Sequence, residues 1–268
     1  MRDQPLDGMG IDLGRVQPGA REIARQVAEV YAHHLGPDLV SLVVHGSGVK
    51  GGLIAGSSDL DFAALVRPEA LTPCRELPFD RVIALHRDLA RIDPAPFRYI
   101  QGYMDALGAR HGVGFIPGTF QVLYGSAAVP LATGDALVES ARSALHALDS
   151  AAIRDRLSNA LLDHGEERLA RQVRFMCTDV WPTMYQVACL REPDPIRIWQ
   201  LTKPEVVALL SDDPVVGPPL RRWWAVITTH YATGEPVDTA LEALVSGVAF
   251  LEAAAIWAGD DLTPSAHR

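Results

Sequence analysis

Cysteine and long apolar runs are both scarce in this chain, and their scarcity excludes several classes of protein. Only three of the 268 residues are cysteines, and Cys74, Cys177 and Cys189 lie far apart without metal-ligand spacing. We therefore expect neither a disulfide framework nor a zinc site, and we interpret each cysteine as a small buried apolar residue. Glu252 interrupts the most apolar stretch, Ala243 to Ala258, so no segment approaches about eighteen uncharged apolar residues.

The first residues of the chain lack an apolar run after a basic start. Together with the missing apolar segment, this predicts no signal peptide, no membrane partner and a cytoplasmic location.

Lysine is also rare, occurring only as Lys50 and Lys203, and the formal net charge is −9. A protein that binds a nucleic-acid backbone normally carries a basic patch, because its affinity comes largely from counterion release. The composition therefore argues against a nucleic-acid partner. It favours a cationic small substrate, which an acidic surface attracts.

The amino-terminal half carries the periodicities of both helices and strands, and this order predicts a small mixed sheet backed by helices. The predicted elements are a helix over Gly19–His34, strands over Val40–His45 and from Asp61 to Val66, helices over Phe79–Ile92 and Phe97–Ala109, and a strand over Thr119–Tyr124.

Strand signals end near Thr133, and only helical patterns follow. A capping box formed by Thr202 and Glu205, with Pro204 in the first turn, predicts a helix start. We therefore expect an α/β (α+β) fold, with a mixed-sheet domain over residues 1–133 and an all-helical bundle over residues 134–268. We expect the tail, Thr263 to Arg268, to be frayed. The other predicted helices of this half are Ala136–Leu148, Ile153–Leu190, Pro218–Tyr231 and Val237–Trp257.

A glycine-serine turn and an acidic strand form the most informative pattern. Gly46 and Ser47 follow an apolar strand, and such a turn brings backbone N–H groups and a hydroxyl close to phosphate oxygens. Eleven residues separate Ser47 from Asp59, and Asp61 lies two positions after Asp59. In a strand their side chains point to the same face about 6–7 Å apart, a spacing at which two carboxylates can share divalent cations.

These residues resemble the signature of the polymerase-β-like nucleotidyltransferase superfamily. The signature is an apolar strand ending in Gly-Ser, then roughly a dozen residues, then Ser-Asp-x-Asp, and it covers Val43–Gly51 and Ser57–Phe62 here. The layout of a sheet half followed by a helical half is similar to the aminoglycoside nucleotidyltransferases. Those enzymes bind substrate in the cleft between the two halves. In their helical bundle a Ser/Thr-Lys pair opens a helix and a later helix ends in tyrosine, as Thr202-Lys203 and Tyr231 do here.

The resemblance implies ATP as co-substrate and a catalytic pair, Asp59 and Asp61, that holds Mg²⁺ and so neutralises charge in the transition state. It also implies that Ser58 orients these carboxylates. The residues implied in nucleotide binding are Gly46, Ser47, Lys50, Ser58 and Lys203. Trp181 or the Trp223-Trp224 pair either lines a substrate cleft or packs in the core.

The general base is not evident from the sequence. Many members of the superfamily supply a third carboxylate from a later strand, but the predicted strand Thr119–Tyr124 offers Gln121, which cannot accept the proton. His45 is interpreted as a hydrogen-bonding residue at a strand end and not as a catalyst. The candidates that stay open are Asp80, Asp88 or Asp105 if the strand assignment is wrong, and Glu166 or Glu167 in the helical half.

The resemblance predicts transfer of a nucleoside monophosphate from ATP or another triphosphate to a hydroxyl of a small, cationic acceptor. Two alternatives remain: a nucleotide-binding protein that has lost catalysis, and an enzyme that adenylylates a protein partner. The sequence leaves the acceptor, the nucleotide base and the oligomeric state undetermined.

Overall fold

The structure is a computed structural model that describes residues 10–108, 112–125 and 129–261. Its contacts divide the chain into two compact units, Met1–Leu131 and Ala132–Arg268. The division falls two residues before the boundary expected from the sequence. The tail expected to be frayed, residues 263–268, lies outside the described residues.

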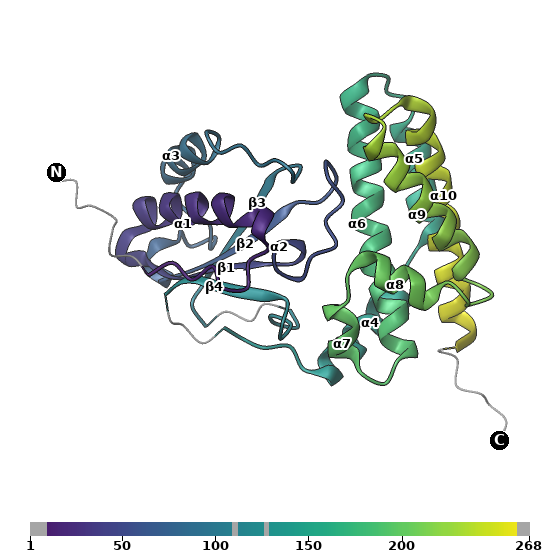
Figure 1. The fold of residues 1–268 in the computed structure, drawn as a ribbon, viewed down its shortest axis with the longest axis horizontal. Helices are drawn as coiled ribbons and strands as arrows, with labels where there is room; N and C mark the ends of the chain where they lie inside the picture. Colours follow the sequence, from purple (N-terminus) through teal and green to yellow (C-terminus); the bar gives the residue numbers. More distant parts are fainter. Residues whose placement is uncertain (1–9, 109–111, 126–128, 262–268) are drawn as a thin grey trace. The chain divides into compact units, whose positions relative to one another are not determined.

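The first unit contains helices and the four strands of a single sheet (Figure 1). Its α-helices are α1 (Arg21–Leu35), α2 (Ser47–Lys50) and α3 (Phe79–Leu89), its strands are β1 (Leu39–His45), β2 (Leu60–Val66), β3 (Ile100–Ala106) and β4 (Phe120–Gly125), and its short 3-10 helices are Pro18–Ala20, Gly36–Asp38 and Pro68–Ala70.

The sheet is mixed, with strand order β3-β2-β1-β4. β1 pairs antiparallel with both β2 and β4, whereas β2 pairs parallel with β3. In the part of the chain described after this sheet, every regular element is a helix. The expected fold class, a small mixed sheet followed by a helical bundle, is therefore confirmed.

β3 corrects the helix predicted over Phe97–Ala109. Ile100 and Met104 pack against the core, and Gly102 lies between them on the same face of the strand. A Cβ at position 102 would lie 2.3 Å from the hydroxyl oxygen of Tyr31, so the tyrosine of α1 fills the space above the glycine. Because the core-facing position carries no side chain, the alternation of a strand is hidden and a helical spacing remains.

One face of the sheet packs against α1, which packs in turn against α3, and Figure 1 shows both helices on the same side of the strands. Leu42 and Val44 of β1 and Leu60 and Phe62 of β2 have no exposed surface and share one core with Val27 of α1. Complete burial of such a side chain contributes about 1.5–3 kcal/mol. These residues therefore fix which face of β1 and β2 turns away from the core.

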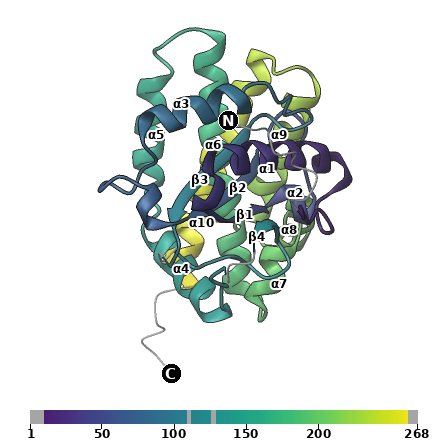
Figure 2. The same cartoon turned by 90° about the vertical axis from the view of Figure 1, so that its left-hand side faces the viewer.

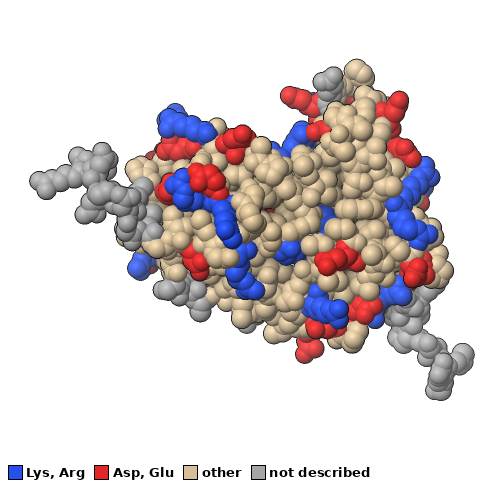
Figure 3. All heavy atoms as spheres, in the orientation of Figure 1, with Lys and Arg blue, Asp and Glu red and all other residues tan. Residues whose placement is uncertain are grey.

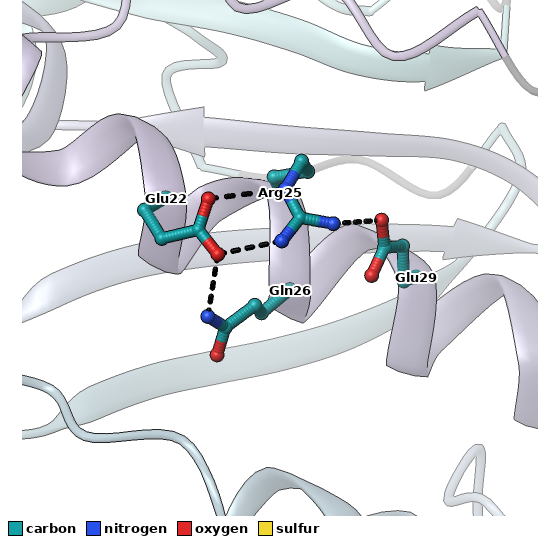
Figure 4. A network of polar contacts seen from close by, with 4 residues as sticks. All are labelled: Glu22, Arg25, Gln26 and Glu29. Carbon is teal, nitrogen blue, oxygen red and sulfur yellow. Dashed lines mark hydrogen bonds and ion pairs between the residues drawn. The ribbon is translucent and has the colours of Figure 1, made fainter.

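The outer side of α1 carries a polar network (Figure 4). Arg25 forms ion pairs with Glu22 and Glu29, and Gln26 donates a hydrogen bond to Glu22. The hydrogen bond from Arg25 lowers the pKa of Glu22 to about 2. Because these ion pairs are exposed to solvent, they contribute little to stability compared with the buried core.

Acidic and basic side chains are interspersed on the face shown in Figure 3. Several arginines are paired with acids, among them Arg81 with Asp38 in the first unit and Arg191 with Asp213 in the second. Asp213 is almost completely buried and also accepts hydrogen bonds from the backbone of Val215 and Val216, so it fixes the turn before the next helix.

The second unit is helical throughout the described residues, and α6, α9 and α10 run side by side (Figures 1 and 2). Met184 of α6, Trp223 of α9 and Phe250 of α10 are fully buried. Its helices are α4 (Gly134–His146), α5 (Ser150–Ala160), α6 (Glu166–Arg191), α7 (Pro195–Gln200), α8 (Lys203–Leu210), α9 (Gly217–Ala232) and α10 (Val237–Asp261).

Two features of this unit differ from the sequence prediction. The single helix predicted over Ile153–Leu190 is two helices, α5, which ends at Ala160, and α6, which follows Gly165 with its φ of +138°. α7 was not predicted; it is short and begins at Pro195 after the capping side chain of Asp194. The capping box of Thr202 at the start of α8 is confirmed.

α10 is the helix whose composition comes closest to that of a membrane span. The segment Val237–Gly259 has a mean hydropathy of 1.6 although it includes Glu252, and half of its most apolar stretch is buried in the structure. A core helix of a soluble protein meets the same criterion, so α10 alone is weak evidence for a membrane.

The cysteines divide into two environments. Cys177 and Cys189 are buried, as expected, but Cys74 is exposed. The interpretation of Cys74 as a buried apolar residue is therefore wrong, because it lies in the loop between Ala70 and the start of α3, outside the core.

Gly48→Ala is expected to lower the free energy of unfolding of the first unit by about 1–3 kcal/mol, the usual cost of overpacking a core. A Cβ there would lie 2.4 Å from Cδ1 of Leu60, which is completely buried. Urea titration followed by far-UV circular dichroism measures the loss. Gly19→Ala is the control, because its Cβ would meet no described atom within 4 Å. Equal losses in the two variants would contradict the assigned packing.

Candidate functional site

The corner after β1 is built around Gly46, which has φ +67°. Its N–H donates to the carbonyl of Thr119 at 3.0 Å, and its carbonyl accepts from the N–H groups of Val49 and Lys50 at 3.1 and 2.9 Å. The glycine-serine turn predicted from the sequence is therefore a corner that leads directly into α2.

The two aspartates follow the alternation predicted for a strand. Asp59 directly precedes β2 and Asp61 is its second residue, and both are half-buried. Leu60 and Phe62 are completely buried in the core beneath α1. Because successive side chains of a strand point to opposite faces, Asp59 and Asp61 lie on the face that α1 does not cover.

The corner and the acidic pair lie together. Asp61 is the register partner of His45, the last residue of β1. A Cβ at Gly46 would lie 2.8 Å from Oδ2 of Asp61, so this carboxylate rests against the glycine. The hydroxyl of Ser47 donates to the carbonyl oxygen of Asp59 at 3.2 Å. The structure therefore brings Gly46, Ser47, Asp59 and Asp61 into one small region.

Ser58 closes the loop that leads to the acidic pair. Its hydroxyl accepts from the N–H of Ile54 at 3.0 Å, and its own N–H donates to the carbonyl of Ile54 at 2.9 Å. The serine is buried, so it holds the backbone just before Asp59. Its predicted role in orienting the carboxylates is compatible with this position and remains a prediction.

The two lysines lie in different units. Lys50 is the last residue of α2 and is half-buried, whereas Lys203 is the first residue of α8. The Nζ of Lys203 lies over the ring of Trp181, 5.7 Å from its centroid. Contact of either lysine with a triphosphate remains a prediction.

The tryptophans of the second unit form an aromatic cluster. The ring centroid of Trp181 lies 5.6 Å from that of Trp223 and 6.1 Å from that of Trp224. Trp223 is completely buried and is a core residue, while Trp181 and Trp224 are half-buried.

The strand that neighbours the acidic pair is β3, and not the predicted strand that holds Gln121. Gln121 lies on β4 at the other side of β1, pairs in register with Val44, and donates its amide to Asp12 at 2.8 Å. It therefore lies on the face opposite to Asp61. The expectation that this strand offers the position of the third acid is wrong.

The other acids of the first unit that were considered for the third position lie outside the register of the acidic pair. Asp105 lies on β3, four residues after Gln101, which is the register partner of Asp61. Its side chain forms an ion pair with Arg75. Asp88 lies on α3 and binds His34 and Arg91. The remaining candidates are Asp80, exposed on α3, Glu167, exposed on α6, and Glu166, whose side chain is outside the description.

Two residues beside the acidic pair were missed by the sequence analysis. Gln101 of β3 is the register partner of Asp61, so its side chain lies on the same face. The hydroxyl of Tyr99 lies 3.2 Å from Oδ2 of Asp59 and 3.3 Å from Oε1 of Gln101. Tyr99, Gln101 and Tyr103 are polar side chains at alternate positions, which in a strand share one face. This alternation could have identified them, but in a helix the same three residues would point in different directions.

His45 lies at the rim of the same region. Its ring contacts Tyr103 and Phe115 edge-on, with centroids 5.9 and 5.8 Å away. Burial lowers the pKa of His45 to about 4, although the charge of Asp59 opposes this shift. Its Nε2 is buried without a hydrogen-bond partner among the described residues, and the role of His45 as a strand-end hydrogen-bonding residue stays a prediction.

The donor set suits a hard cation that is bound together with phosphate. The described residues contain no group of three His, Cys, Asp or Glu side chains that could hold a metal ion. Mg²⁺ is commonly held by one or two carboxylates, waters and substrate phosphates, without a cage of protein ligands. Asp59 and Asp61 fit that arrangement.

No family model matches the chain, and no curated protein matches its sequence. Among solved structures it is similar to the spectinomycin adenyltransferase of Enterococcus faecialis, determined with ATP and spectinomycin. The similarity covers 88% of this chain and 98% of that chain, with a TM-score of 0.53 and 14% identity. The chain therefore has the same fold as that adenyltransferase. At this identity the likeness shows the fold alone, and the roles of single residues depend on their geometry.

Gly46→Ala is expected to weaken binding of Mn²⁺, used as a spectroscopic substitute for Mg²⁺, because the new Cβ displaces the Asp61 carboxylate. Titration followed by electron paramagnetic resonance measures the affinity. Gly36→Ala is the matched control. Gly36 has φ 52° and ψ −126°, close to the φ 67° and ψ −138° of Gly46, but its Cβ would meet no described atom within 4 Å.

Both variants carry a similar backbone strain, of about 1–3 kcal/mol. Only Gly46→Ala should lose metal affinity. If the two variants lose affinity equally, the effect comes from strain and the contact with Asp61 has no bearing on the cation.

Proposed function

We propose that this protein is a Mg²⁺-dependent nucleotidyltransferase that moves AMP from ATP to a hydroxyl of a small, cationic, aminoglycoside-like acceptor. The observation that carries the proposal is the contact of the Asp61 carboxylate with the Gly46 corner, beside the bond from Ser47 to Asp59. The first unit would be the catalytic domain, the second a helical domain, and the location cytoplasmic.

The choice of substrates has two supports. The structurally similar adenyltransferase was determined with ATP and with spectinomycin, a small molecule. The net charge of −9 also favours a cationic acceptor over a nucleic acid, because an acidic protein attracts cations and repels phosphate backbones.

In the proposed reaction an acceptor hydroxyl attacks the α-phosphorus of ATP. A new phosphorus–oxygen bond forms, the bond to the oxygen bridging the α- and β-phosphates breaks, and pyrophosphate leaves. Mg²⁺, when bound, neutralises the charge that develops on the phosphate oxygens. Asp59 and Asp61 would hold this cation, while the backbone of Gly46 and the hydroxyl of Ser47 would hold the β- and γ-phosphates.

Ser58 would keep the acidic pair in place through the loop that it closes. Lys50 and Lys203 would add positive charge against the triphosphate, and the capped start of α8 would add the positive end of a helix dipole beside Lys203.

The proton of the attacking hydroxyl requires an acceptor. β3 presents Gln101 beside Asp61, and an amide accepts no proton at neutral pH. This observation favours a second candidate function, a protein that binds ATP without turnover. Glu167 of the helical unit stays a candidate base for the first function.

Asp61→Asn is expected to lower the rate of nucleotidyl transfer at least about a hundredfold, because metal-assisted charge stabilisation contributes several kcal/mol to such reactions. The assay uses ATP labelled at the α-phosphate, Mg²⁺ and a panel of aminoglycosides and aminocyclitols including spectinomycin. Release of pyrophosphate and transfer of label to the acceptor are both measured. Asp155→Asn, an exposed acid on α5 that is not a candidate for the third carboxylate, is the control and should leave the rate unchanged.

Binding of ATP without pyrophosphate release, for every acceptor tested, would favour the second candidate function. Label that appears in a protein band, with none in the small molecules, would contradict the proposed acceptor class.

A further inference from the structure

Main-chain hydrogen bonds hold the residues directly before and directly after Asp59. The N–H of Arg98 donates to the carbonyl of Ser58 at 2.8 Å, and the N–H of Leu60 donates to the carbonyl of Tyr99 at 3.1 Å. The parallel pairing of β2 and β3 thus extends one step before the strands begin. Tyr99 is therefore held next to Asp59 by main-chain hydrogen bonds, whatever its side chain does.

The Tyr99 hydroxyl lies between two acceptors. It is 3.2 Å from Oδ2 of Asp59 and 3.3 Å from Oε1 of Gln101, but a hydroxyl has one proton. An ionised carboxylate is the stronger acceptor, so the proton goes to Asp59. Rotation of the Gln101 amide by half a turn then places its NH₂ group against the tyrosine oxygen. All three groups are satisfied as Gln101 donates to Tyr99 and Tyr99 donates to Asp59.

This series of hydrogen bonds, from Gln101 to Tyr99 to Asp59, restrains the Asp59 carboxylate, which would bind the cation. The carbonyl of Asp59 is bound by the Ser47 hydroxyl, and its side chain by the Tyr99 hydroxyl. Main chain and side chain of Asp59 are thus both held. Groups that orient a metal-binding carboxylate typically change metal affinity 10- to 100-fold when removed, as a rough range.

We propose that Tyr99 is a positioning residue for the Asp59 carboxylate and that Gln101 acts by holding the Tyr99 hydroxyl. The proposal rests on the proposed function, because it requires Asp59 to be a cation ligand. Gln101 accordingly serves as a hydrogen-bond donor at the position of β3 beside Asp61.

The exposure of these side chains makes the proposal testable without unfolding the protein. Tyr99 is 42% exposed and Gln101 is exposed, so neither supports the core. Tyr99→Phe removes one oxygen atom and keeps the ring. Tyr124→Phe makes the same chemical change on β4, where the ring packs against the core.

The experiment is a titration with Mn²⁺ alone, followed by electron paramagnetic resonance, on the full chain. Tyr99→Phe is expected to weaken Mn²⁺ binding about tenfold. Gln101→Leu is expected to weaken it by a smaller factor, and Tyr124→Phe should have the wild-type affinity. Thermal unfolding is measured for each variant and should match the wild type within the change caused by Tyr124→Phe.

The double variant separates a relay from two independent effects. Because Gln101 acts through the tyrosine hydroxyl, Tyr99→Phe with Gln101→Leu should bind Mn²⁺ no more weakly than Tyr99→Phe alone. If the losses of Mn²⁺ affinity in the two single variants multiply in the double variant, Gln101 does not act through Tyr99 and that part of the proposal is overturned. Wild-type affinity in Tyr99→Phe would overturn the positioning role and leave the proposed function intact. Failure of the wild-type protein to bind Mn²⁺ both alone and together with a non-hydrolysable ATP analogue would overturn the proposed function and this inference with it.

Discussion

The close approach of the Asp61 carboxylate to the Gly46 backbone is the constraint on which the proposed site depends. β1 ends at His45, whose register partner is Asp61, so the corner after β1 lies beside the start of β2. The positive φ of the corner favours glycine, and a Cβ there would lie 2.8 Å from the carboxylate. Glycine at position 46 thus allows both the positive φ of the corner and the close approach of the Asp61 carboxylate. A phosphate held at the corner would meet a cation held by the acids without any rearrangement of the sheet.

Features set by local periodicity could be predicted from the sequence. The alternation through β2 places Leu60 and Phe62 in the core beneath α1 and leaves the aspartates on the opposite face, because a strand has a period of two. The capping box at Thr202 and the long apolar helices are local in the same sense. The corner and the acidic pair were therefore found from the sequence.

Features set by distant contacts could not be predicted. The core-facing position at Gly102 is filled by Tyr31, about seventy residues earlier along the chain, so β3 lacks the alternation of a strand. With β3 assigned as a helix, the search for a third acid went to Gln121 on the far strand. Tyr99 and Gln101 were missed for the same reason. Both errors come from one long-range parallel pairing, and they fall next to the proposed site.

A crystal structure of the protein with Mn²⁺ and a non-hydrolysable ATP analogue tests the central claim most directly. The account predicts an anomalous scattering peak bound by both Asp59 and Asp61, with the terminal phosphates of the analogue at Gly46 and Ser47. A peak that touches neither aspartate, or a triphosphate bound away from the corner, would contradict it.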